Sequence, residues 1–249
     1  MNQSSNLVFG AHAVIEALRS GKEFEKILLK KELSGEVLRE VLKNAREKNI
    51  TYQFVPNEKL DRLCHKNHQG IIAFISEIEY SKLEQIIPTL YEQGKEPFIL
   101  VLDHITDVRN FGSIARSAEG AGVHAIVIPE KGAAQINADA IKTSSGALHN
   151  IPVCRVQNLV NTIIYLAGSG LKIISASEKG NEIYSKANYQ GPVAIVMGAE
   201  DTGVNKEILR KSDQIVNIPL FGKVQSLNVS VASALILYEV VRQRIENYK

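Results

Sequence analysis

The amino-acid sequence predicts an α/β protein built on a largely parallel sheet. Short apolar segments rich in Val and Ile recur along the chain, separated by segments whose apolar residues have helical spacing. Such continuous apolar runs are typical of parallel strands, because helices cover both faces of a parallel sheet. The 249 residues, 45% of them hydrophobic and 22% charged, suffice for one large domain or two smaller ones with a packed core.

Residues 1–76 predict a small α/β domain of their own. The spacing of apolar residues predicts helices over 11–19 and 34–48, the second with Ser34 as its N-cap. We expect strands at 26–30, 51–55 and 70–76, and a short helix after Pro56.

Residues 77–96 are polar and predict a linker with a partly helical segment, followed by a second domain at 97–249. This domain opens with the buried strand 98–103. The elements expected after it are a helix near 111–120, strands at 125–129 and near 151–154, a helix near 158–167, strands at 172–177, 193–198 and 214–219, and a helix from about 228 to 246.

Composition and charge narrow the function classes. No stretch approaches the roughly 18 apolar residues of a membrane span, and the first residues do not read as a secretory leader. Cys64 and Cys154 stand far apart, which favours the reducing cytoplasm and no disulfide framework. The net charge of +2 does not decide for or against RNA, but residues 1–76 hold 12 lysines and arginines against 9 acidic residues.

Two motifs point to chemistry that we do not expect. Residues 120–125 fit the dinucleotide pattern GxGxxA, but a helix precedes them and a strand follows, the reverse of the order that phosphate binding requires. We therefore predict a helix end and a tight turn there, and the same at 168–170. Residues 64–68 contain one Cys and two His, but no second cysteine is near, so we predict a polar loop and no metal.

Three segments carry polar groups and glycines at predicted strand ends: 102–123, 195–204 and 216–241. Loops at the carboxyl ends of parallel strands are where α/β proteins bind ligands, so we expect one pocket formed by all three.

Individual residues in these segments have simple structural interpretations. Asn110 is expected to cap the following helix, and either Ser226 or Asn228 to cap the C-terminal one. Gly198 allows the backbone to approach another group closely. Arg116 alone would be read as a solvated helix residue.

The three segments in this order resemble the motifs of the SpoU (TrmH) family of RNA ribose 2′-O-methyltransferases, within the SPOUT class. VFGAHAVIEAL and NHQGIIAF in the first domain are similar to the substrate-binding domain of the RlmB-like branch, which modifies a guanosine of large-subunit (23S) ribosomal RNA. Two residues depart from the family pattern: Val108 replaces the usual proline, and Ala199 the usual asparagine.

The resemblance implies a C-terminal α/β knot domain with a deep trefoil knot and a smaller N-terminal α/β domain that is ribosomal-protein-L30e-like. It also implies a homodimer that binds RNA and uses S-adenosylmethionine as methyl donor, without a metal. The residues implied in cofactor binding are Gly198, Ile218, Ser226, Leu227 and Asn228.

The resemblance assigns catalytic roles to four residues. These are Asn110, Arg116, Glu200 and Asn228. Glu200 is expected to orient Arg116, and Arg116 to act on the ribose hydroxyl or to hold the adjacent phosphate. The candidate RNA-binding residues are Lys30, Lys31, His65, Lys66, His68 and Arg109.

Three other interpretations stay open. A transfer-RNA methyltransferase of the same family would carry the same motifs. A non-catalytic RNA-binding or ribosome-assembly protein could keep the fold, although the complete catalytic set disfavours it. A small-molecule α/β enzyme with a nucleotide cofactor is disfavoured by the reversed glycine motif.

Overall fold

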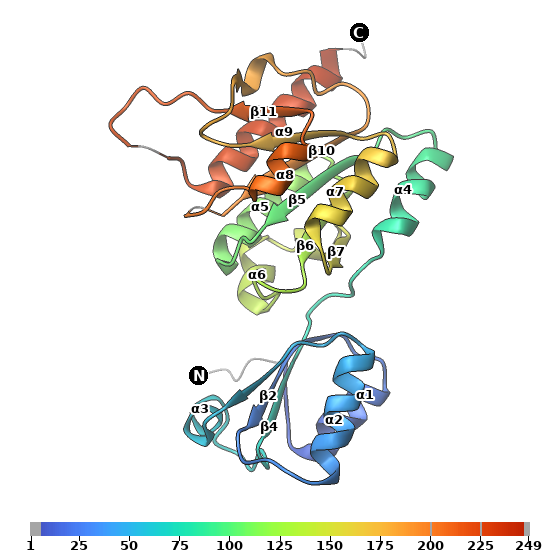
Figure 1. Cartoon of the computed structure of the whole chain (residues 1–249), viewed down its shortest axis with the longest axis vertical. Helices are drawn as coiled ribbons and strands as arrows, with labels where there is room; N and C mark the ends of the chain where they lie inside the picture. Colours follow the sequence, from blue (N-terminus) through green and yellow to red (C-terminus); the bar gives the residue numbers. More distant parts are fainter. Residues whose placement is uncertain (1–5, 200, 225, 247–249) are drawn as a thin grey trace. The chain divides into compact units, whose positions relative to one another are not determined.

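The computed structural model describes residues 6–199, 201–224 and 226–246 (Figure 1). The chain divides into two compact units, the first formed by Met1–Glu79 with Ile136–Ala138 and the second by Tyr80–Gln135 with Asp139–Lys249. Among the described residues, no helix has the length and hydropathy needed to cross a membrane.

The first unit is a four-stranded sheet with helices on both faces. Its strand order is β1-β4-β2-β3, in which β2 and β3 run parallel and the other pairs antiparallel. Its elements are β1 (Leu7–Phe9), α1 (Ala11–Arg19), β2 (Phe24–Lys30), α2 (Glu36–Glu47), β3 (Tyr52–Val55), α3 (Asn57–Leu63) and β4 (Ile71–Ile75).

Successive side chains of β2 point to opposite faces of the sheet, so the core of this unit lies on both faces. Ile27 and Leu29 pack with the helices α1 and α2, whereas Leu28 packs with Leu60 of α3. All three β2 side chains are fully or almost fully buried. The first unit therefore has its own core on both sides of its sheet.

The sequence predicted every helix and three of the four strands of the first unit. The proposed N-cap Ser34 was wrong, because α2 begins after Gly35, whose φ of 95° suits glycine, and no side chain caps the helix. The strand β1 was not predicted, since three half-buried residues are too short to show a period. It pairs antiparallel with β4.

The second unit contains a seven-stranded sheet in which every pair runs parallel, as the sequence predicted. The strand order is β7-β6-β5-β10-β8-β11-β9. The strands are β5 (Phe98–Asp103), β6 (Ala125–Pro129), β7 (Val153–Val156), β8 (Lys172–Ala176), β9 (Glu182–Ile183), β10 (Val193–Gly198) and β11 (Gln214–Asn217). The helices are α4 (Leu83–Glu92), α5 (Val108–Gly120), α6 (Ala138–Thr143), α7 (Leu159–Gly168), α8 (Lys206–Lys211) and α9 (Val229–Glu246), with single 3-10 turns at Ala147–His149 and Tyr184–Lys186.

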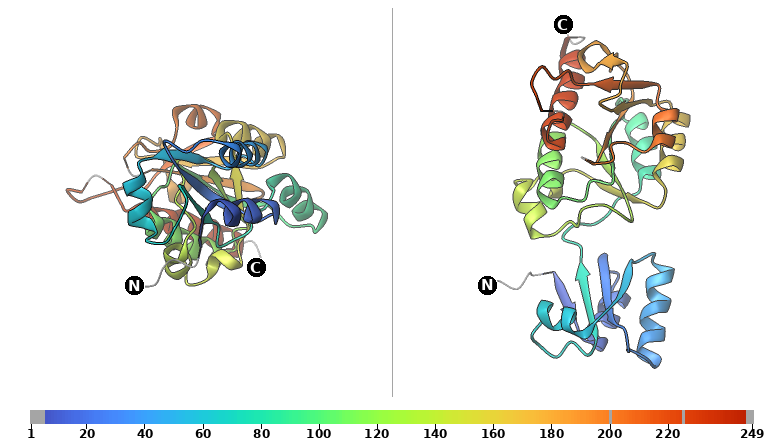
Figure 2. Two further views of the ribbon diagram at one scale, coloured as in Figure 1. Left: turned by 90° about the horizontal axis from the view of Figure 1, so that it is seen from below. Right: turned by 60° about the vertical axis from the view of Figure 1, so that its left-hand side comes forward.

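Helices cover both faces of this sheet (Figure 2). Side chains of α4, α7 and α8 form one core with alternate residues of the central strands, such as Ile99 and Val101 of β5. On the other face, α5 packs along α9, and α9 contacts β10. Successive side chains of β5 thus point to opposite faces of the sheet, and helices cover both faces. This explains why every residue position of the strand but the last is apolar.

The segment expected as a linker contributes a helix to the second unit. Leu83 and Ile87 of α4 are buried in the same core as Ile99, and Tyr80 forms a β-bridge with Val153. The partly helical segment predicted at 77–96 is thus helix α4.

Both misleading glycine motifs are helix ends, as predicted. Helix α5 ends at Gly120, and Gly122 turns the chain into β6 with a φ of 74°. Helix α7 ends at Gly168, and Gly170 has a φ of 87° before β8. Neither turn presents a helix N-terminus to a phosphate.

Candidate functional site

Two of the three predicted segments meet through a pair of asparagines. Asn228, just before α9, donates a hydrogen bond from Nδ2 to Oδ1 of Asn110 at 3.0 Å. Asn110 lies in the first turn of α5, so the contact joins the loop after β5 to the loop after β11. Two residues assigned to catalysis by the resemblance are therefore in direct contact.

The caps of α5 and α9 explain how these asparagines are placed. The predicted cap Asn110 was wrong, because Asp107 caps α5 and its Oδ1 accepts a hydrogen bond from the Asn110 N–H at 2.7 Å. At α9, Oδ1 of Asn228 accepts from the Ser230 N–H at 2.9 Å, so Asn228 rather than Ser226 acts as the cap. The two caps hold the helix ends at which the asparagine side chains meet.

A buried carboxylate joins the first segment to Asn205, the residue that follows the second segment. Asp103 ends β5 and is 2% exposed. Its Oδ2 accepts a hydrogen bond from the Asn205 N–H at 2.7 Å, and its Oδ1 lies 2.5 Å from Nδ1 of His104. His104 has a φ of 60°, a backbone conformation that is rare outside glycine and is held here by the contact with Asp103.

Gly198 allows a close backbone approach, as the sequence predicted. A Cβ placed there would lie 2.1 Å from the carbonyl carbon of Gly203 and 2.2 Å from the Val204 nitrogen. The loop returns to this point because the Gly203 N–H donates to the Ala199 carbonyl at 2.9 Å. The group that approaches Gly198 is thus the backbone of its own loop.

The other residues of these loops that were predicted to bind the cofactor, to act in catalysis or to bind RNA differ in how far they are buried. Ile218 and Leu227 are half-buried, while Ser226 is exposed. Arg109 and Arg116 are exposed on α5. Glu200 lies outside the described residues.

Four of the six candidate RNA-binding residues line one hollow in the first unit. The hollow has a volume of about 660 Å³. Among its lining residues are Lys30, His65, Lys66 and His68. Lys31 is exposed at the end of β2 but does not line the hollow, and Arg109 belongs to the second unit.

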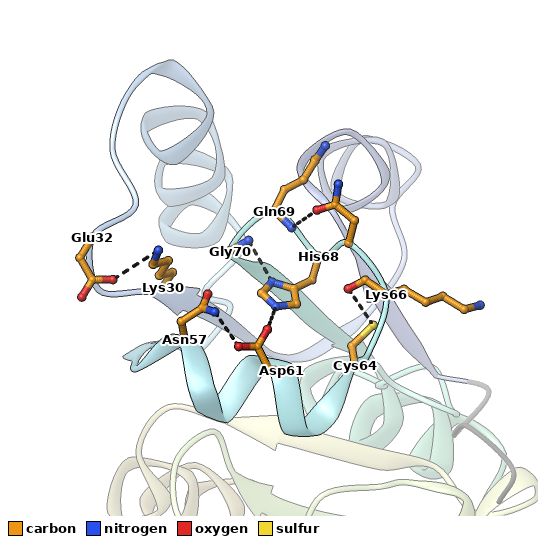
Figure 3. Close-up of polar contacts among 10 residues, drawn as sticks. Lys30, Glu32, Asn57, Asp61, Cys64, Lys66, His68, Gln69 and Gly70 are labelled. Atoms are coloured by element: carbon orange, nitrogen blue, oxygen red, sulfur yellow. Dashed lines mark hydrogen bonds and ion pairs between the residues drawn. The ribbon is translucent and has the colours of Figure 1, made fainter.

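The ring of His68 lies between Asp61 of α3 and Gly70, which precedes β4 (Figure 3). It is 6% exposed, its Nδ1 accepts from the Gly70 N–H at 3.0 Å, and its Nε2 lies 2.9 Å from Oδ1 of Asp61. A ring nitrogen that accepts carries no proton, so Nε2 donates to Asp61. His68 therefore holds Asp61 by a hydrogen bond, and its direct contact with RNA stays a prediction.

Asp61 and Asn57 were missed in the sequence. Both lie on α3, one turn apart, and Asn57 donates from Nδ2 to Oδ2 of Asp61 at 2.6 Å. The signal available was the spacing i, i+4 of two polar residues on a short helix, which is common on solvated faces.

The buried Cys154 thiol is not activated as a nucleophile. Burial, with a smaller effect of Glu84, raises the pKa of the Cys154 thiol to about 12, which keeps it protonated at neutral pH. Within the described parts of the chain, no three His, Cys, Asp or Glu side chains are grouped as metal ligands.

Two family models match the chain in the order of its two units. Residues 7–81 match the model described as RNA 2′-O ribose methyltransferase substrate binding. Residues 97–238 match the model of the SpoU rRNA Methylase family.

Curated relatives match over nearly the full length. The chain is 35% identical to the TrmH family protein YacO of Bacillus subtilis over 98% of each chain. It is 37% identical to a TrmH family protein of Staphylococcus saprophyticus over 96% of each chain. The names of both relatives describe tRNA/rRNA methyltransferases.

Solved structures of methyltransferases share the fold. The SpoU methyltransferase AviRb from Streptomyces viridochromogenes, in complex with AdoMet, matches with a TM-score of 0.61 at 26% identity, over 96% of this chain and 90% of AviRb. The TrmH/SpoU tRNA modifying enzyme of A. aeolicus matches with a TM-score of 0.56 at 28% identity, over 66% of this chain and 85% of its own.

We predict that Gly198→Ala displaces the loop after β10. The new methyl group would overlap the Gly203–Val204 backbone, so the free energy of unfolding should fall by roughly 1–3 kcal/mol, measured by urea denaturation. Gly222→Ala is the matched control, because a Cβ at Gly222 meets nothing within 4 Å. Equal stabilities of the two variants would contradict the close approach.

Proposed function

The chain belongs to the SpoU rRNA methylase family of TrmH-type RNA methyltransferases, and from this premise we propose that it methylates the ribose 2′-hydroxyl of a guanosine in 23S ribosomal RNA. The methyl donor in this proposal is S-adenosylmethionine. The observation that carries the proposal is the contact of Asn110 with Asn228, which unites two motif loops of the methylase region.

The first unit supports a ribosomal substrate. Residues 7–81 match a substrate-binding model, whereas the tRNA modifying enzyme of A. aeolicus matches only 66% of this chain. The resemblance of the first unit to the branch that modifies a large-subunit guanosine favours that nucleotide. An RNA substrate also favours action in the cytoplasm.

The loops around the asparagine pair fit the chemistry of S-adenosylmethionine. Ile218 and Leu227 are half-buried apolar side chains on either side of the loop after β11, which suits an adenine ring. Gly198, Ser226 and Asn228 complete the proposed binding set. The bound sulfonium would supply an activated methyl group.

The protein must align the ribose hydroxyl and assist the loss of its proton. Arginine is almost always protonated, so we assign Arg116 to the phosphate beside the hydroxyl, where its positive charge favours the alkoxide. Glu200 is proposed to orient Arg116. Asn110 and Asn228, held by their hydrogen bond and helix caps, are proposed to fix the geometry of the site.

We propose a deep trefoil knot in the second unit and three regions along the chain. The regions are an RNA-binding domain at 1–76, a connection at 77–96 and the methyltransferase domain at 97–249. The matched ranges 7–81 and 97–238 support this division. The knot rests on family resemblance, because knots are nearly absent from folds in general.

A homodimer is proposed through the exposed face of α9. The helix carries large apolar side chains at Val231, Leu235, Tyr238 and Ile245, all exposed. Their separations of four, three and seven residues place them on one side of the helix, a pattern typical of helix pairing. A second copy of the chain is the proposed occupant of this face.

The substrate is tested by mapping. Purified protein should transfer tritium from labelled S-adenosylmethionine to ribosomal RNA, and RNA from a deletion strain should lack one 2′-O-methylguanosine of 23S RNA. A methyl group lost from transfer RNA instead would favour the tRNA enzyme. No transfer to any RNA would favour a non-catalytic RNA-binding protein.

We predict that Arg116→Ala lowers the rate of methyl transfer by at least about a hundredfold, because a charge that stabilises the reacting oxygen is lost. Binding of S-adenosylmethionine, measured by calorimetry, should change little. Arg210→Ala, which removes an exposed arginine from α8, is the matched control. Loss of cofactor binding by a folded Arg116 variant would contradict the assignment.

We predict that Val231→Glu shifts the protein from dimer to monomer in sedimentation equilibrium, because a charge would be buried in the proposed interface. Ile164→Glu is the matched control: both side chains are 50% exposed, but Ile164 lies on α7. A wild-type monomer, or a dimer unaffected by Val231→Glu, would contradict the proposed interface.

A further inference from the structure

The hollow of the first unit is polar and carries charges of both signs. Lys30 and Lys66 are its ammonium groups, and Glu32 and Asp61 its carboxylates. A site that held only phosphates would be expected to lack carboxylates, because they repel phosphate. The composition instead suits a ligand with both a phosphate and a polar ring edge, as in a nucleotide.

The carboxylate of Asp61 is held by two other side chains of the hollow. Its Oδ1 receives a hydrogen bond from buried His68, and its Oδ2 receives one from Asn57 (Figure 3). The Asp61 side chain nevertheless stays 57% exposed. Since each carboxylate oxygen can accept two hydrogen bonds, one acceptor position remains on each.

His68 is itself fixed, so Asp61 has little freedom to turn away. The ring is buried, and the Gly70 N–H donates to Nδ1 at 3.0 Å. Gly70 has a φ of 78°, a conformation that suits glycine. A chain of hydrogen bonds thus runs from the start of β4 to the carboxylate on α3.

A fixed carboxylate that offers two adjacent acceptors selects among the RNA bases. Guanine alone presents two adjacent donors, N1–H and the N2 amino group, on its Watson–Crick edge. Adenine and cytosine each place an acceptor beside their amino group, and uracil flanks its single N–H with acceptors. An acceptor facing a carboxylate is unfavourable because neither group supplies a proton.

We propose that this hollow binds one unpaired guanosine of the substrate RNA, with Asp61 receiving hydrogen bonds from guanine N1 and N2. The inference rests on the proposed function in that the ligand is part of an RNA. Base edges become accessible in loops and bulges, where proteins recognise RNA sequence.

The lysines would hold the phosphates of the same nucleotide. Nζ of Lys30 lies 3.9 Å from Oε2 of Glu32. This ion pair is long and partly exposed, so a phosphate could replace the Glu32 carboxylate as the partner of Lys30. Lys66, the second lysine of the lining, has its ammonium group 5.7 Å from the centroid of the Phe9 ring.

The first test uses the full-length wild-type protein and fluorescently labelled oligouridylates. Each oligonucleotide carries one central guanosine, inosine or adenosine, and inosine lacks only the N2 amino group. Anisotropy should show guanosine bound about tenfold more tightly than inosine or adenosine, the effect of a good bidentate base contact. Equal affinities, or no binding of any oligonucleotide, overturn the proposal.

The second test compares Asp61→Asn with Glu58→Gln. Both remove one negative charge from α3, but Glu58 does not line the hollow. Asp61→Asn should lose the preference for guanosine, because the amide faces one guanine donor with another donor, while Glu58→Gln should keep it. A folded Asp61→Asn protein that retains the preference overturns the proposal; if the variant does not fold, the wild-type series decides.

Methyl transfer separates this inference from the proposed function. A wild-type protein that methylates ribosomal RNA but shows no preference for guanosine refutes only the role of the hollow. A protein that prefers guanosine but transfers no methyl group to RNA refutes only the proposed catalysis.

Discussion

The parallel pairing of β5 with β10 is the constraint on which the methyl-transfer region depends. The two strands are far apart in sequence, yet their register places Gly198 beside Asp103 at the same end of the sheet. The loops that follow must then share a small space. Asp103 joins them by accepting the Asn205 N–H, and Gly198 admits the returning backbone. The backbone that returns to Gly198 leaves no room for a Cβ there, and the buried Asp103 carboxylate depends on its hydrogen bonds.

The sequence was sufficient for most elements because apolar periodicity reports burial directly. It was insufficient for caps. Asp107 and Asn110 are both good N-cap residues, and local preference could not decide which of them begins α5. Only the packing of the helix on the sheet selects Asp107, which places Asn110 one turn inside, where it meets Asn228. The pocket of three loops stays a prediction, whereas the contacts that the structure shows at these segments came from the tertiary fold.

For the hollow of the first unit, the sequence indicated several candidate residues but not the contacts that hold them. Lysines and histidines there were recognisable from the sequence as RNA-binding candidates, because charge is visible residue by residue. The role of His68 was not, since burial and the hydrogen bond from Gly70 arise only when β4 pairs with β2 beneath α3. Asp61 was not predicted as a site residue, because a lone acidic residue on a short helix is usually solvated.

The loops around Gly198 and the hollow of the first unit therefore differ in the atoms that determine their geometry. Around Gly198 the determinants are backbone atoms, so substitutions there disturb the fold together with the site. In the hollow the determinants are side chains, several of them exposed, so an exchange of Asn57 or Asp61 should change the proposed recognition at little cost to the core formed by Leu28 and Leu60. Under the proposed assignment, changes in the hollow would change the RNA on which the chain acts while the methyl-transfer loops stay the same. The specificity of such an enzyme should accordingly be sought in its first unit rather than in the loops that perform the chemistry.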